Sequence, residues 1–201
     1  MRRTYDLTKN VHQGHHKIWI TSEAKEDLKL WRSFLQNFNG TTIIRAKIES
    51  TSSHINMFSD SCLTGFGATF GSNYITGRFP DSWQKYSITV LETYPVLAII
   101  GTFCYRLRNS HINFHTDNMG VAYILNKQTS KNQTIMIMIR KLVLILLENN
   151  ITLTARHIPG NTNYICDLLS RKQVPAEVLR EQGLKVSATP IPPQLLPENL
   201  I

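Results

Sequence analysis

Four acidic residues lie where predicted strands end or predicted helices begin: Asp60, Glu92, Asp117 and Asp167. Each has an ordinary structural explanation when it is taken singly. An aspartate can end a strand or cap a helix, and an acid in the first helical turn, such as Asp167, favours the helix dipole. Thr89-Val-Leu-Glu92 matches a capping box, in which Glu92 would only reach back to the backbone of Thr89.

Taken as a group, the four acids indicate a cation site, because carboxylates gathered at one point repel one another unless divalent cations neutralise them. Ligands that are all oxygen, without Cys or His, suit Mg²⁺ or Mn²⁺ rather than zinc. Two such ions about 4 Å apart can activate a water molecule and stabilise the leaving oxygen in phosphodiester cleavage. The acids therefore predict metal-assisted hydrolysis of a phosphodiester.

The elements that must position these acids are those of a mixed sheet. Short apolar runs between turn residues, and two later runs among helical patterns, predict strands over residues 54–59, 65–70, 74–79, 111–116 and 151–157. Their order predicts an α/β fold with a five-stranded mixed sheet, three antiparallel strands followed by two parallel ones, and helices on both faces. Asp60 and Asp117 end the first and fourth strands, and ligands collect at the carboxyl ends of neighbouring parallel strands.

Helical periodicity predicts helices over residues 22–38, 89–107, 118–126, 135–147 and 163–172. Glu92 shares a helical stripe with Val96 and Ile99, so it should lie at the edge of the face that packs on the sheet, where an unpaired carboxylate is costly. The apolar run 135–147 is too short to span a bilayer and is broken by Arg140-Lys141, which indicates a core helix.

The chain divides into an N-terminal segment with an amphipathic helix (1–50), a core domain (51–173) and a Pro-rich tail or linker (174–201).

Twenty-two Lys and Arg against 14 Asp and Glu leave a formal net charge of +8, which favours a polyanionic partner such as nucleic acid. Three cysteines without regular spacing fit neither a disulfide framework nor a zinc ribbon. With no apolar signal core at the start, we expect a cytoplasmic or nuclear protein, not a secreted one.

The order of the acids resembles the ribonuclease H signature over residues 54 to 172: Asp60, Glu92 opening the first long helix, Thr116-Asp117-Asn118 after the fourth strand, and His157 ten residues before Asp167. Several motifs resemble, more narrowly, the ribonuclease H regions of retrotransposon reverse transcriptase polyproteins, of DIRS-type or gypsy-like elements. They are Phe79-Pro80-x-x-Trp83, Leu91-Glu92-x-Tyr94, His115-Thr116-Asp117-Asn118, His157-Ile-Pro-Gly160-x-x-Asn163 and Asp167-Leu-Leu-Ser-Arg171. The segment from Asp27 to Gly40 is similar to the connection between polymerase and ribonuclease H in such polyproteins, although no Tyr-x-Asp-Asp polymerase motif is present.

The resemblance implies a ribonuclease H-like fold in which the four acids bind two Mg²⁺ ions, with Mn²⁺ as a substitute. It implies that His157, placed on the loop before the last helix, assists proton transfer or product release. The substrate would be an RNA–DNA hybrid, recognised by its shape and 2′-hydroxyls, whose RNA strand is cut to leave 5′-phosphate and 3′-hydroxyl ends. A polymerase domain or subunit would be a partner through residues 22–40, and no membrane is expected.

Two alternatives remain open from the sequence. The chain could be a non-catalytic remnant that keeps the fold as a nucleic-acid-binding module, or a related-fold nuclease or integrase that acts on DNA. The run Gly65-Phe-Gly67-Ala-Thr-Phe-Gly71 lies within strands, which argues against a phosphate-binding loop. The resemblance places these glycines where the backbone of the hybrid comes close.

Overall fold

The computed structural model describes residues 7–9, 11–36 and 55–200, without the side chains of Ser33 and Phe34. The chain forms two compact units, Met1–Ala46 and Lys47–Ile201, each described here by itself. The first unit contains the predicted amphipathic helix, α2 (Ser22–Gln36). Thr21 caps it, because its hydroxyl accepts a hydrogen bond from the Ala24 amide at 3.3 Å. The predicted helix end near Asn39-Gly40 lies outside the described residues.

The second unit is built on the predicted sheet. Its strands are β1 (Ile55–Ser61), β2 (Gly65–Phe70), β3 (Asn73–Arg78), β4 (His111–Thr116) and β5 (Thr152–His157). They lie in the order β3-β2-β1-β4-β5. The strand β2 is antiparallel to β1 and β3, whereas β4 is parallel to β1 and β5. The predicted five-stranded mixed sheet is therefore confirmed.

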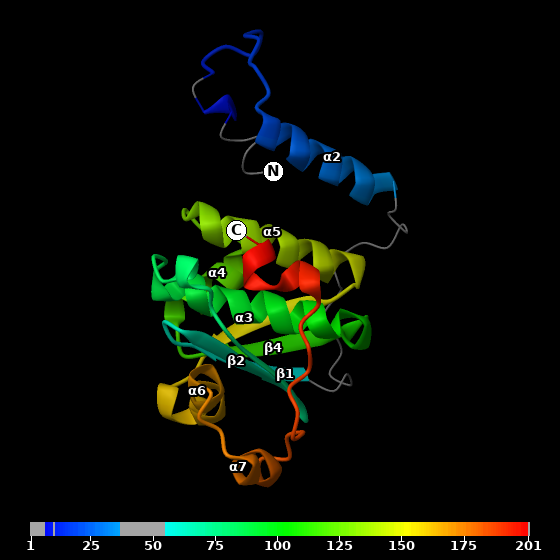
Figure 1. Cartoon of the computed structure of the whole chain (residues 1–201). Helices are drawn as coiled ribbons and strands as arrows, with labels where there is room; N and C mark the ends of the chain where they lie inside the picture. Colours follow the sequence, from blue (N-terminus) through cyan, green and yellow to red (C-terminus); the bar gives the residue numbers. More distant parts are fainter. Residues whose placement is uncertain (1–6, 10, 37–54, 201) are drawn as a thin grey trace. The chain divides into compact units, whose positions relative to one another are not determined.

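Helices cover both faces of this sheet, as Figure 1 shows. The α-helices are α3 (Ile88–Phe103), α4 (Met119–Lys127), α5 (Gln133–Glu148), α6 (Tyr164–Arg171) and α7 (Ala176–Glu181). Short 3₁₀ turns span Asp81–Trp83, Cys104–Leu107, Gly160–Asn163, Pro193–Leu195 and Pro197–Asn199. The helices α3, α4 and α5 lie on one face of the sheet, and α6 and α7 lie on the other (Figure 1).

The main apolar core lies between the sheet and the layer of α3, α4 and α5. The β-strands contribute fully buried Met57, Ile112 and Phe114 to it. An aromatic cluster extends this core beside β2 and α3, with ring centroids 4.8–5.6 Å apart: Phe66, Phe79, Trp83 and Tyr94. The segment Ile88–Leu107 has the length and composition of a membrane span, but 67% of it is buried within the domain, so we assign it to the core.

The other face of the sheet allows a very close approach of α6 over β2. A methyl group on Gly65 would overlap the carbonyl oxygen of Ser170, and one on Gly67 would overlap the side chain of Leu169. These glycines therefore make room for the helix, because any larger residue would lift it from the sheet. The helix α6 covers Gly65 and Gly67, whereas nothing lies within 4 Å of a methyl group on Gly71. The expectation that these glycines lie where a hybrid comes close stays a prediction.

The residues after Gln173 do not form the expected linker or frayed tail. Beyond α7, the chain runs along β3, where the Thr189 amide donates a 2.8 Å hydrogen bond to the Tyr74 carbonyl. It then reaches α3, where the Tyr94 hydroxyl donates to the Leu195 carbonyl at 3.0 Å. Leu195 and Leu200 are each 6% exposed and belong to the main core. Pro193 and Pro197 begin the two 3₁₀ turns of this stretch, which still packs on the domain.

Candidate active site

Asp60 is the buried acid of β1. It pairs with Gly67 across the antiparallel ladder, so both positions lie on the face that α6 covers. Its Oδ2 atom accepts a hydrogen bond from the Ser170 hydroxyl at 3.0 Å. The pKa of Asp60 is raised from 3.8 to about 6, mainly by burial and also by the charges of Asp117 and Asp167, while the hydrogen bond from Ser170 partly offsets the rise.

Glu92 lies in the first turns of α3, and the expected capping box is wrong. The helix begins at Ile88 after Ser87, so Thr89 is already helical and cannot cap it. The Glu92 side chain is buried, and among the residues that the structure describes its Oε2 atom has no hydrogen-bond partner. An orphaned carboxylate oxygen is costly, which makes this atom a candidate ligand for a cation.

The pKa of Glu92 is raised from 4.5 to about 7, mainly by burial. The side chain of Asn118 lowers this pKa, whereas the negative charges of Asp117 and Asp60 raise it. The charges of the acids at the ends of β1 and β4 therefore both act on Glu92. Glu92 lies on α3, on the face of the sheet opposite to α6 (Figure 1).

Asp117 follows the last residue of β4 and is half-buried. Its Oδ1 atom accepts a hydrogen bond of 3.5 Å from the side-chain amide of Asn163, which also donates to the Ser59 carbonyl at 2.8 Å. Gly160 lies beside Asp117, since a methyl group there would come within 3.2 Å of the Oδ2 atom. The turn before α6 thus borders this acid.

Asp167 lies in the first turn of α6, where its Oδ1 atom accepts a 2.8 Å hydrogen bond from Nε of Arg171. The two side chains are 41% and 52% exposed, respectively. The other face of this helical turn is buried through Cys166 and Leu169. Asp167 is thus more accessible than Asp60 and Glu92, and it already has a cationic partner.

The four predicted acids are electrostatic neighbours, since the charges of Asp117 and Asp167 act on Asp60 and those of Asp117 and Asp60 act on Glu92. Within residues 7–9, 11–36 and 55–200, however, no three Asp, Glu, His or Cys side chains stand ready to hold a metal ion. The donor set still fits a hard divalent cation, because it is all oxygen and leaves one buried carboxylate oxygen unpartnered.

His157 is the last residue of β5, paired with Thr116, and not part of the following loop as expected. Its ring is exposed, and Nε2 lies 3.1 Å from the carbonyl oxygen of Asp117. The ring is therefore fixed at the edge of the acid cluster, with Nδ1 as its second nitrogen.

Three residues around the acids had no role in the sequence-based prediction: Ser170, Asn163 and Asn118. Asn118 also caps α4, because its Oδ1 atom accepts a 3.1 Å hydrogen bond from the Val121 amide. All three lie within the motifs that carry the ribonuclease H resemblance. Their position in those motifs was a signal, but the motifs do not reveal which carboxylate each side chain contacts.

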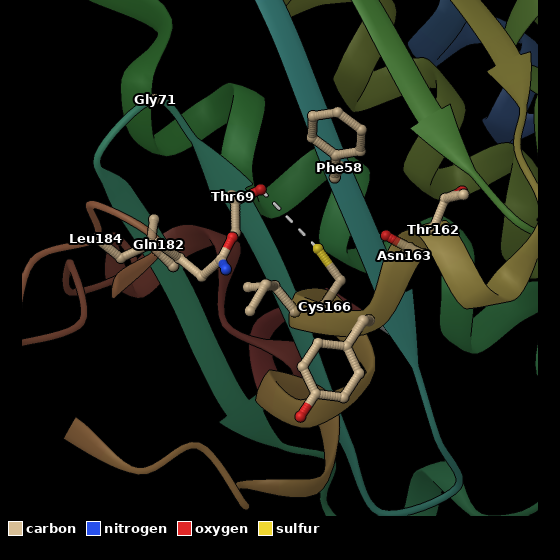
Figure 2. Close-up of a pocket in the computed structure, with 10 residues that line it drawn as sticks. Phe58, Thr69, Gly71, Thr162, Asn163, Cys166, Gln182 and Leu184 are labelled. Carbon is tan, nitrogen blue, oxygen red and sulfur yellow. Dashed lines mark hydrogen bonds between the residues drawn. The ribbon is translucent and has the colours of Figure 1, made fainter. Parts of the chain in front are cut away.

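A pocket of about 320 Å³ lies beside the start of α6, on the same face of the sheet. Figure 2 shows Phe58, Thr69 and Cys166 around it, with the Thr69 hydroxyl 3.9 Å from the Cys166 sulfur. None of the four acids lines this pocket. Asn163 borders both features, since it lines the pocket and contacts Asp117. The pocket is therefore adjacent to the acid cluster but separate from it.

No family model matches the sequence, and no curated protein matches it. Among solved structures, the chain is similar to LC11-RNase H1 in complex with an RNA/DNA hybrid, with a TM-score of 0.50 and 16% sequence identity over 59% of this chain and 94% of that one. This chain has a ribonuclease H-like fold. It also matches RNase H1 of the archaeon Halobacterium salinarum, with a TM-score of 0.47 and 14% identity over 60% of this chain and 97% of that one.

A larger protein also matches, the foamy viral protease-reverse transcriptase in complex with an RNA/DNA hybrid. The TM-score is 0.41 and the identity 12%, over 86% of this chain and 28% of that one. The likeness to LC11-RNase H1 is what supports the fold. The function has to be argued from the residues of the site.

Proposed function

We propose that this protein is a two-metal ribonuclease H that hydrolyses the RNA strand of RNA–DNA hybrids. One observation carries the proposal: Asp60 and Glu92 are both buried, the charge of Asp117 helps to raise the pKa of each, and one Glu92 oxygen has no hydrogen-bond partner within the described part of the chain. A protein keeps buried, mutually repelling carboxylates at a cost in stability, which a bound cation would remove.

In this proposal, Asp60, Glu92, Asp117 and Asp167 hold two Mg²⁺ ions, or Mn²⁺ in their place. When bound, the ions would activate a water molecule and stabilise the leaving oxygen of the phosphodiester. The chain would supply an all-oxygen donor set, in which Asp60 and Asp117 would be the central ligands at the ends of β1 and β4. Glu92 and Asp167 would each bind one ion.

His157 moves a proton in this scheme. Its Nε2 atom is engaged by the Asp117 carbonyl, so Nδ1 is the atom that accepts and releases a proton. A neutral imidazole is suited to this near physiological pH. The ring is exposed, which gives the substrate or a water molecule access to it.

The proposed substrate is an RNA–DNA hybrid. The net charge of +8 favours a polyanion, and the structurally similar LC11-RNase H1 was solved in complex with an RNA/DNA hybrid. The 2′-hydroxyls of the RNA strand distinguish such a hybrid from a DNA duplex.

We further propose that the chain derives from the reverse transcriptase of a DIRS-type or gypsy-like retrotransposon and acts in the cytoplasm or nucleus. A polymerase domain or subunit would bind residues 22–40. The described part of that segment displays Leu28 and Leu35 with 45% and 63% of their surfaces exposed. Apolar residues of this size on a helix surface are what a partner would cover.

The proposal is tested by incubating the purified protein with a labelled RNA–DNA hybrid, an RNA duplex and a DNA duplex, in Mg²⁺ or Mn²⁺. We expect cleavage of the hybrid alone, and its loss in Asp60→Asn. Asp81→Asn is the matched control, because Asp81 lies in a separate 3₁₀ turn and contacts Gln84. Equal inactivity of wild type and Asp60→Asn would favour a non-catalytic nucleic-acid-binding module, and preferential cutting of the DNA duplex would favour a DNA nuclease.

A further inference from the structure

Two consecutive residues at the end of α6 each hold one acid of the candidate site. The Ser170 hydroxyl lies 3.0 Å from Oδ2 of Asp60 and 2.8 Å from the main-chain carbonyl oxygen of Asp167, so these two acceptors share its single hydrogen. Arg171 donates from Nε to Oδ1 of Asp167 at 2.8 Å. The final turn of this helix therefore contacts one acid from the sheet and one from its own first turn.

The contact of Ser170 is held rigidly. Ser170 is 1% exposed, Asp60 is 8% exposed, and the Ser170 backbone lies directly against Gly65 of β2. The hydroxyl beside Oδ2 restricts the orientation of the Asp60 carboxylate. Removal of such an outer partner commonly weakens metal binding, since the ligand loses its orientation.

The contact of Arg171 is different in kind. Both Arg171 and Asp167 are exposed by 40% or more, so the ion pair is screened by solvent and easily broken. A guanidinium on Oδ1 of Asp167 and a divalent cation at the same carboxylate repel each other. Arg171 and a metal ion therefore compete for Asp167.

We propose that Ser170 and Arg171 are positioning residues with opposite effects on metal binding, Ser170 by orienting Asp60 and Arg171 by occupying Asp167. This inference rests on the proposed function, because it assumes that these acids hold divalent ions.

The test is a titration of the full chain with Mn²⁺ at pH 8 without nucleic acid, in which free Mn²⁺ is measured by electron paramagnetic resonance. We expect Ser170→Ala to weaken Mn²⁺ binding about tenfold. We expect Arg171→Gln to tighten it by about two- to fivefold at low ionic strength, and by less in high salt, where the ion pair is already screened.

Two matched variants control for the loss of a buried hydroxyl and of an exposed charge. Ser110→Ala removes a part-buried hydroxyl that donates to the Leu107 carbonyl at 2.6 Å and lies at the opposite end of β4 from Asp117. Lys172→Gln removes a positive charge one residue after Arg171. Both should bind Mn²⁺ as the wild type does, and thermal unfolding of every variant checks its folding. Because Arg171 is exposed, its variant tests the inference even if Ser170→Ala does not fold.

The outcomes separate this inference from the proposed function. If Asp60→Asn binds Mn²⁺ as tightly as the wild type, the acids do not form a metal site and the proposed function fails. If Asp60→Asn loses binding while Ser170→Ala and Arg171→Gln match the wild type, only this inference is overturned. Weaker binding in Arg171→Gln would also overturn it, because it would mean that Arg171 supports the site.

Discussion

The Nε2 atom of His157 lies 3.1 Å from the main-chain carbonyl oxygen of Asp117, at the paired ends of β5 and β4. A carbonyl oxygen can only accept, so Nε2 carries the hydrogen and the neutral ring has its lone pair on Nδ1. The bond fixes the ring beside Asp117 without using the nitrogen that can take up a proton. A substitution can therefore remove the proton-accepting nitrogen of residue 157 and still keep the hydrogen bond that positions its side chain.

His157→Ala should lower kcat on an RNA–DNA hybrid about 10²-fold, with little change in KM, because proton transfer occurs in the transition state. His157→Gln keeps an N–H donor for the Asp117 carbonyl but has no titratable group. The two variants should therefore be similarly slow, which steady-state kinetics will show. A Gln variant as active as the wild type would mean that His157 only positions Asp117.

Glu92 should destabilise the metal-free protein at high pH. Its pKa in the folded protein, about 7, lies above its ordinary value of 4.5. At pH values between 4.5 and 7, Glu92 therefore takes up a proton when the protein folds. The associated stability is present below pH 4.5 and is lost as the pH rises through 7. Glu92→Gln should therefore raise the Tm by about 4 °C at pH 8 in a chelator, and by much less at pH 5.

Thermal unfolding by circular dichroism at the two pH values measures this difference. Glu148→Gln is a suitable control, because Glu148 ends α5 at the surface and its substitution should leave the Tm nearly unchanged at both pH values. A loss of stability in Glu92→Gln at pH 8 would show that the ionised carboxylate is satisfied within the protein.

Protons and metal ions should compete for Asp60 and Glu92. Both carboxyls have raised pKa values, about 6 and about 7, so both are increasingly protonated as the pH falls from 8 to 6. The Mg²⁺ concentration for half-maximal cleavage should rise by roughly tenfold over that interval, because ion binding must displace a proton. Cleavage assays over a Mg²⁺ series at each pH test this, and a constant requirement would exclude these two acids as ligands.

Local patterns in the sequence carried the prediction of the sheet. The strand β4 was predicted at its observed bounds, 111–116, because Ile112 and Phe114 alternate with polar residues. The succession of elements predicted three antiparallel strands followed by two parallel ones, with Asp60 and Asp117 at the ends of the first and fourth strands. Features that depend on sequence periodicity and on the succession of elements could therefore be predicted without the structure.

Contacts between distant segments were not accessible. Thr89 and Glu92 have capping-box spacing, but the helix begins earlier, at Ile88, because the preceding Ser87 already has the extended backbone of an N-cap residue. Ser170 reaches Asp60 only because Gly65 lets α6 approach the sheet. Such contacts depend on the exact position of a helix relative to the sheet. A local sequence pattern does not determine that position.

Gly67→Ala should disrupt the site through α6. The added methyl would overlap Leu169 and lie 2.9 Å from the Ser170 amide, so the helix that carries Asp167 must move. We expect a loss of about 3 kcal/mol of stability, measured by urea unfolding, together with loss of cleavage. Gly14→Ala is the control, because nothing lies within 4 Å of the added methyl there. An active and stable Gly67→Ala variant would contradict the close packing of α6.

The C-terminal segment should be part of the folded domain and not a dispensable tail. Leu195 is 6% exposed, packs into the main core, and lies against Gly101 of α3. Its carbonyl satisfies the buried hydroxyl of Tyr94. Leu195→Ala should therefore cost about 2–4 kcal/mol in the free energy of unfolding, since it removes a buried side chain and leaves a cavity beside α3.

Urea unfolding of the full chain measures this cost, with Leu63→Ala as the control because Leu63 is 60% exposed and should change stability by less than about 0.5 kcal/mol. Since Tyr94 follows Glu92 by half a helical turn, the packing of Leu195 also supports the stretch of α3 that holds Glu92. The metal requirement of Leu195→Ala should therefore rise along with its instability. If Leu195→Ala is as stable as Leu63→Ala, the segment does not stabilise α3, and truncation before Leu195 should then leave the domain intact.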